Sequence, residues 1–93
     1  NSCEWNQDKV KSNLKKHDVG FHEACSVFRD PIFITVLDKA HSVYEERYIT
    51  IGLSEKNRLL VIAHTERGDK IRIISARKAT KNERKFYEEA EYW

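Results

Sequence analysis

Three arginines in the second half of the chain carry side chains that could act on a phosphate group. Arg47 lies early in one predicted strand, Arg72 lies inside another, and Arg77 ends that second strand. The planar, permanently charged guanidinium matches the oxygens of a phosphate. A charged side chain within a strand of a small protein must face solvent or a cleft. The pattern indicates a phosphate-binding cleft, and the alternative is a set of exposed arginines paired with glutamates.

The spacing of Arg72 and Arg77 sets a condition on such a cleft. The two residues are five positions apart, so on a regular strand their side chains point to opposite faces. Both can line one site only if a bulge or a strand end intervenes.

Acid–base chemistry would need a carboxylate, an imidazole or a phenol near these arginines. Glu46 is the first candidate for a general base, and its alternative is a surface ion pair. His64 would lie beside Arg72 in a regular hairpin and could titrate near neutral pH, or it is a hydrogen-bonded core histidine. Tyr87 could stack on a base or donate a proton, or it packs against the sheet.

Basic charge is concentrated in the second half of the chain. Residues 1–46 contain six Lys/Arg and eight Asp/Glu, whereas residues 47–85 contain eleven and four. A local excess of about seven positive charges attracts phosphates. The alternative is a solvated basic face, and the same two alternatives apply to Lys9 and Lys16 in the first half.

The sequence offers no convincing metal or cofactor motif. His22 and Cys25 form a single pair with no second pair at zinc-site spacing, and the three glycines form no phosphate loop. We therefore predict neither a metal nor a cofactor. Cys3 and Cys25 could form one disulfide, but in a cytosolic chain we expect free thiols, with Cys25 in the core.

Periodicity predicts two helices, then four strands, then a helix, and residues 3–5 could form a short first strand before them. In the helix over 8–17, Val10, Leu14 and His17 form the expected inward stripe, beside a polar stripe with Asn13. Asp30-Pro31 ends the second helix, and Thr80 with Glu83 forms a capping box for the last. The predicted strands are 3–5, 32–37, 44–53, 58–65 and 70–77, and the predicted helices are 8–17, 21–29 and 80–92.

This order is typical of an α+β domain in which the helices pack on a four- to five-stranded antiparallel sheet. The 93 residues allow a single domain, 1–93. No apolar run has the length of a membrane span, and no secretory signal is visible. We expect a cytoplasmic protein.

Ordered short motifs from about residue 4 to residue 88 resemble the BrnT family. Asn6 and Asp18 depart from its usual pattern, and neither removes a basic or catalytic-type group. The matching stretches are Glu4-Trp5, Lys9, Asn13, Lys16-His17, Val19-Gly20-Phe21, Glu23-Ala24, Val27-Phe28, Asp30-Pro31, Glu46-Arg47, Gly52, Thr65-Glu66-Arg67-Gly68, Arg72–Ala79, Glu83 and Tyr87.

The resemblance implies the toxin of a type II toxin–antitoxin pair, with a fold similar to RelE-like ribonucleases. Such a toxin cleaves RNA and halts translation. The partner implied is a DNA-binding antitoxin of the BrnA type, in a complex of two toxins and two antitoxins. DNA would be contacted only through that antitoxin.

Metal-independent RNA cleavage needs a base for the 2′-hydroxyl, cations for the pentavalent phosphate and an acid for the 5′-oxygen. We place Arg72 and Arg47 at the phosphate and Arg77 at the edge of the site, with Glu46 as base and His64 as a further acid or base. The candidate RNA contacts are Lys9, Lys16, Arg67, Lys70 and Tyr87. The alternatives are a non-catalytic RNA- or ribosome-binding module and a pure interaction protein.

Overall fold

The computed structural model describes residues 2–90, and the predicted order of elements is confirmed over that range. The predicted end of the last helix at Tyr92 lies outside the described residues. The elements are β1 (Ser2–Trp5), η1 (Gln7–Lys9), α1 (Val10–His17), α2 (Phe21–Ser26), η2 (Val27–Arg29), β2 (Ile34–Leu37), η3 (Lys39–His41), β3 (Tyr48–Leu53), β4 (Leu59–Arg67), β5 (Lys70–Lys78) and α3 (Lys81–Ala90).

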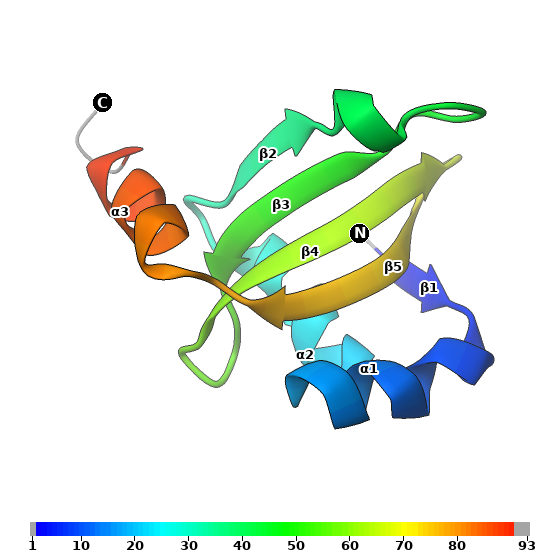
Figure 1. The fold of residues 1–93 in the computed structure, drawn as a ribbon, viewed down its shortest axis with the longest axis horizontal. Helices are drawn as coiled ribbons and strands as arrows, with labels where there is room; N and C mark the ends of the chain where they lie inside the picture. The colour runs from blue at the N-terminus through cyan, green and yellow to red at the C-terminus, as the bar shows by residue number, and fades with distance from the viewer. Residues whose placement is uncertain (1, 91–93) are drawn as a thin grey trace.

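The α+β class is confirmed, but the five-stranded sheet is mixed rather than wholly antiparallel. Its order is β1-β5-β4-β3-β2 (Figure 1). Strands β2 to β5 pair antiparallel, as short connections require. Strand β1 pairs parallel to β5, from Ser2 beside Lys70 to Trp5 beside Ile73. The rule that short connections give antiparallel pairs does not apply to β1 and β5, because α1, α2 and three strands lie between them in the sequence.

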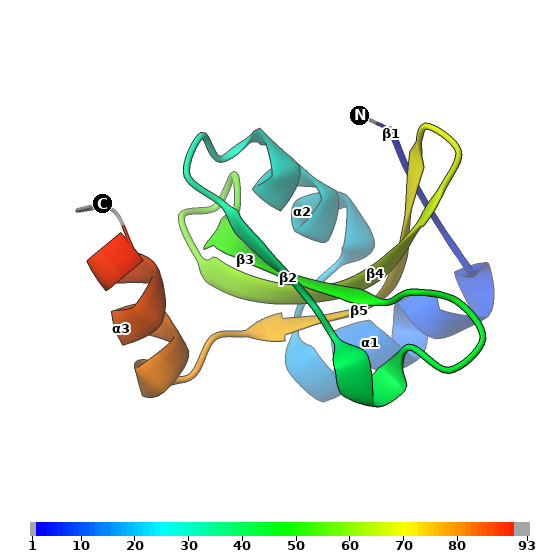
Figure 2. The same cartoon turned by 90° about the horizontal axis from the view of Figure 1, so that it is seen from above.

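The main core lies between the sheet and α2. Figure 2 shows α2 on one side of the sheet, with α3 and the turn after β2 on the other. The most buried side chains of this core include Leu60, Ile62 and Ile73. Val19 from the connection between α1 and α2 and Val27 from η2 pack against them. Within residues 2–90, no helix has the length and apolar character needed to cross a membrane.

Helix α1 contacts the sheet through a polar side chain. The amide of Asn13 donates to the carbonyls of Val19 and Ala76, both at 2.9 Å, and accepts from the N–H of Ala76 at 3.2 Å. Strand β1 stops pairing at Trp5, so Asn13 supplies the hydrogen bonds that a neighbouring strand would otherwise make. The expected inward stripe is therefore wrong in part. Asn13 is buried and Leu14 is 49% exposed.

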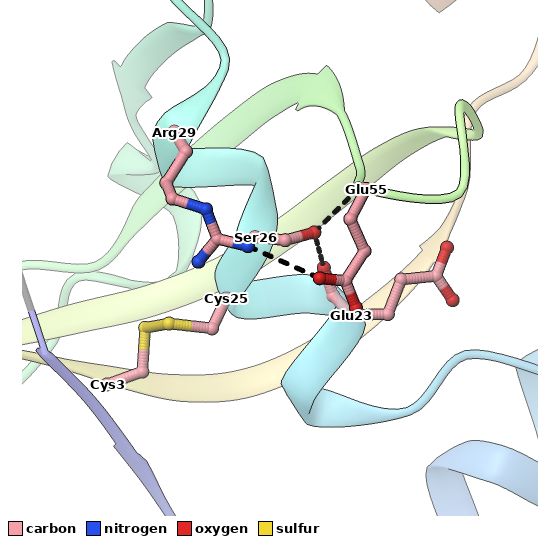
Figure 3. The surroundings of a disulfide bond; sticks show 6 residues. All are labelled: Cys3, Glu23, Cys25, Ser26, Arg29 and Glu55. Atoms are coloured by element: carbon pink, nitrogen blue, oxygen red, sulfur yellow. Dashed lines mark hydrogen bonds and ion pairs between the residues drawn. A yellow bond between two sulfur atoms is a disulfide. The ribbon is translucent and has the colours of Figure 1, made fainter.

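The expectation of free thiols is wrong, because Cys3 and Cys25 form a disulfide between β1 and α2 (Figure 3). Both residues pack against the main core between the sheet and α2. Their proximity follows from the parallel placement of β1, which lays Cys3 beside Ile71 of β5. The expected core position of Cys25 is partly met, since its side chain is half-buried.

A second, smaller core lies under α3. The buried ring of Tyr87 packs with Ile51, Leu59 and Val61, and its hydroxyl donates to Asp30 at 2.6 Å. The predicted capping box is confirmed. The Glu83 N–H donates to the Thr80 hydroxyl, and the Thr80 N–H donates to the Glu83 carboxylate.

Candidate active site

The sheet face opposite α2 is covered by α3 at one end and is open beyond it. In Figure 1 this face is turned toward the viewer, with α2 behind the sheet and α1 below β5. A cavity of about 250 Å³ lies on it, which we call the site cavity. Its lining consists of Asp38, His41, Arg47, Ile49, Val61, Ala63, Ile74, Ser75 and Arg77.

A β-bulge brings Arg72 and Arg77 to the same face of the sheet. Ala63 pairs with Ser75 whereas His64 pairs with Ile73, so Ile74 is the extra residue. The bulge meets the condition that the spacing of the two arginines imposed.

Arg47 lies at the rim of the site cavity, where its backbone is fixed by the segment between β2 and β3. Its N–H donates to the Ser42 hydroxyl at 2.9 Å, and its carbonyl accepts the Asp38 N–H at 2.8 Å. Within residues 2–90, no carboxylate lies at ion-pair distance from the Arg47 guanidinium. This cation is therefore available to an anion in the cavity.

Asp38 and His41 form a pair that the sequence analysis did not identify. The turn η3 closes over three residues and places His41 Nδ1 2.9 Å from Asp38 Oδ2. When Nδ1 carries the hydrogen of this bond, Nε2 is the free acceptor. The Asp38 side chain is largely buried, and that of His41 is 66% exposed. The pair thus has the geometry of a general base held by a carboxylate.

Arg77 is held on the other side of the site cavity by Glu83 of α3. Two parallel hydrogen bonds of 2.7 and 2.8 Å join the guanidinium to the carboxylate. The bond to Arg77 lowers the pKa of Glu83 to about 2, so the pair is fully charged at neutral pH. Arg77 is thereby fixed in orientation, with its charge partly balanced.

Two other predicted site residues lie outside this cavity. Arg72 is on the same face but pairs with Glu4 of β1 at 3.0 Å. Glu46 is exposed on the segment before β3, and neither residue lines the site cavity.

His64 lies in the interior on the α2 side. Its side chain is 2% exposed, and Nε2 lies 2.7 Å from the Thr50 hydroxyl. The ring contacts those of Phe28 and Tyr48, and burial lowers its pKa to about 4. Of the two interpretations of His64, the structure therefore confirms the hydrogen-bonded core histidine.

The predicted RNA contacts are dispersed. Lys9 and Lys16 line a separate cavity of about 310 Å³ beside α1. Arg67 pairs with Glu45 at 3.2 Å, Lys70 is exposed at the hairpin, and the packing alternative for the buried Tyr87 is confirmed.

A larger cavity of about 450 Å³ lies elsewhere, between α2 and the turn that precedes β4. Its buried Glu23 is bound by Arg58 and by the Ser54 hydroxyl. The hydrogen bond from Arg58 lowers the pKa of Glu23. Because these groups satisfy one another, we interpret this cavity as structural. Within residues 2–90, no three His, Cys, Asp or Glu side chains gather closely enough to share a metal ion.

Comparisons with known proteins agree with the fold and with the family motifs. A family model described as "Ribonuclease toxin, BrnT, of type II toxin-antitoxin system" matches residues 5–83. The fold is similar to the 1.1 Å crystal structure of the Brucella abortus ribonuclease toxin BrnT, with a TM-score of 0.66 and 19% identity, over 87% of this chain and 100% of that one. No curated protein matches.

Proposed function

Because the chain belongs to the BrnT family of ribonuclease toxins of type II toxin–antitoxin systems, we propose that it cleaves RNA in the site cavity without a metal ion. One observation carries this assignment. The cavity brings together the carboxylate-held imidazole of Asp38–His41 and the guanidinium of Arg47, which has no carboxylate partner among residues 2–90. These groups correspond to the base and the phosphate-binding cation that 2′-hydroxyl attack needs.

In the proposed reaction, His41 Nε2 takes the proton of the 2′-hydroxyl, and the 2′-oxygen attacks the adjacent phosphorus. Arg47 binds the oxygens of the pentavalent phosphate, and the fixed Arg77 binds at its edge. The bond from phosphorus to the 5′-oxygen breaks, and that oxygen takes a proton from water. The proton held on His41 Nε2 then passes to the resulting hydroxide, which restores both the water and the neutral imidazole. The products are a 2′,3′-cyclic phosphate and a free 5′-hydroxyl.

This proposal assigns two of the roles expected from the sequence differently. The base becomes His41 in place of Glu46, and Arg72 becomes a residue that pairs with Glu4 of β1. We assign no step to His64, because its buried ring lies on the other face of the sheet.

Cleavage of a labelled single-stranded RNA in excess EDTA tests the proposal, with Arg47→Ala beside its matched control Arg72→Ala. Loss of a transition-state cation costs about 10²- to 10³-fold in rate, so we expect that loss for Arg47→Ala and a much smaller one for Arg72→Ala. Equal losses in the two variants, or cleavage that requires an added divalent metal, would refute it.

The family implies an antitoxin partner, and we further propose a BrnA-type, DNA-binding antitoxin in a complex of two copies of each chain. Acidic residues of that partner would fit the cationic site cavity and block RNA. We also propose that the protein acts in the cytoplasm, that its substrate is RNA, and that cleavage of this RNA inhibits translation.

A further inference from the structure

The free edge of β5 separates two cavities. Strand β1 pairs with β5 only as far as Ile73, and beyond it the edge is contacted by Asn13 at Ala76. The bulge residues Ile74 and Ser75 line the site cavity on the sheet face. They also line the cavity of about 310 Å³ beside α1, here called the α1 cavity. The two cavities therefore meet at the bulge, one strand apart.

The α1 cavity has the chemistry of an anion site. Its lining combines Lys9, Lys16 and His17 with Ser12 and Asn13, and among the residues that the structure describes it includes no carboxylate. Within residues 2–90, neither lysine lies within ion-pair distance of an Asp or Glu. The larger cavity between α2 and β4 differs, because there Glu23 and Arg58 neutralise each other.

From this arrangement we infer that single-stranded RNA crosses β5 at the bulge. The scissile phosphate lies in the site cavity, and the backbone of adjacent nucleotides lies in the α1 cavity against Lys9 and Lys16. A cationic groove that follows the backbone suits a flexible single strand, and a strand can turn over the edge of a sheet where a duplex cannot. This inference rests on the proposed function for its substrate.

The test compares two double variants of α1 and the residue before it. Lys9→Gln/Lys16→Gln removes both charges of the α1 cavity. Lys11→Gln/Lys15→Gln removes two exposed charges that line neither cavity, so the net charge of the two proteins is equal. Binding is measured with a twelve-nucleotide 2′-O-methyl RNA, which cannot be cleaved, and activity with an unmodified dinucleotide, which has only the scissile phosphate. Thermal unfolding verifies that both variants fold.

We expect the Lys9/Lys16 variant to bind the long RNA roughly tenfold more weakly, with a salt slope reduced by about 1.4, and the control variant to match the unsubstituted protein. Dinucleotide cleavage should be unchanged in the Lys11/Lys15 control variant, whose substituted residues line neither cavity. Equal weakening in the two variants, or an unchanged affinity for the long RNA, would overturn the inference. So would lost antitoxin binding with unchanged RNA affinity, which would assign the α1 cavity to the protein partner. Failure of the proposed function is seen separately, as absence of dinucleotide cleavage by the unsubstituted protein.

Discussion

At the scale of single residues, His64 couples the stability of the protein to pH. Burial lowers its pKa from an ordinary value near 6.5 to about 4. As pH falls below 6.5 the unfolded chain binds the proton first, so stability is full above that pH and is lost toward pH 4. Glu83, with a pKa of about 2, adds a loss of the same sign only below about pH 4.5.

We therefore expect the free energy of unfolding to fall by about 2 kcal/mol between pH 7 and pH 5. Urea unfolding of the unsubstituted protein and of His64→Leu at both pH values measures this change. The variant should lack most of it, and its Thr50 hydroxyl keeps a partner in Thr35 at 2.6 Å. An equal pH dependence in both proteins would show that His64 is not responsible.

The sequence predicted part of the candidate site. The rest depends on which side chains the fold brings together, which residue types and spacing do not show. Arg47 and Arg77 were identified from their chemistry, and the need for a bulge between Arg72 and Arg77 was foreseen. His41 was missed because its partner Asp38 becomes visible only when the segment closes into a 3-10 turn. The spacing Asp38-x-x-His41 was the sequence feature that could have indicated this pair, because one 3-10 turn brings the two side chains together. Glu46 was preferred because it adjoins Arg47 in sequence, although adjacent residues on an extended chain point in opposite directions.

At the scale of the elements, α1 is attached to the sheet by hydrogen bonds as well as by apolar contact. Asn13→Ala leaves the Ala76 N–H and two buried carbonyls without their partner. We expect a loss of roughly 2–4 kcal/mol in the free energy of unfolding. Leu14→Ala, the adjacent residue of the same helix, should cost less than about 1 kcal/mol because its side chain is half-exposed. Chemical unfolding of the two variants measures the difference, and a larger cost for Leu14→Ala would contradict the assignment.

The elements themselves were largely predictable, since each has a local pattern. Alternation and β-branched residues indicated β2 to β5, and the capping box marked the start of α3. The parallel pairing of β1 and the polar contact of α1 were not predictable, because both depend on contacts between residues about 63 to 68 positions apart. The free-thiol expectation failed because it rested on an assumed cytosolic compartment, whereas the placement of β1 beside β5 brings Cys3 to Cys25.

At the scale of the whole molecule, the disulfide joins the edge strand β1 to α2 and closes a loop of 22 residues. Loop closure of that length restricts the unfolded chain by about 3 kcal/mol. We expect reduction with dithiothreitol, or the double variant Cys3→Ser/Cys25→Ser, to lower the free energy of unfolding by about that amount. Urea unfolding under oxidising and reducing conditions measures it, and coincident curves would show that the bond adds no stability.

The central claim is that the Asp38–His41 pair removes the proton in RNA cleavage. The most direct measurement is the single-turnover rate on a labelled RNA in excess EDTA for His41→Gln, with Glu46→Gln as its control. General-base catalysis contributes about 10²- to 10⁴-fold, so we predict a loss of at least about 10²-fold for His41→Gln and a near-normal rate for Glu46→Gln. A folded His41→Gln protein with full activity, beside an inactive Glu46→Gln protein, would contradict the claim and return the base to Glu46.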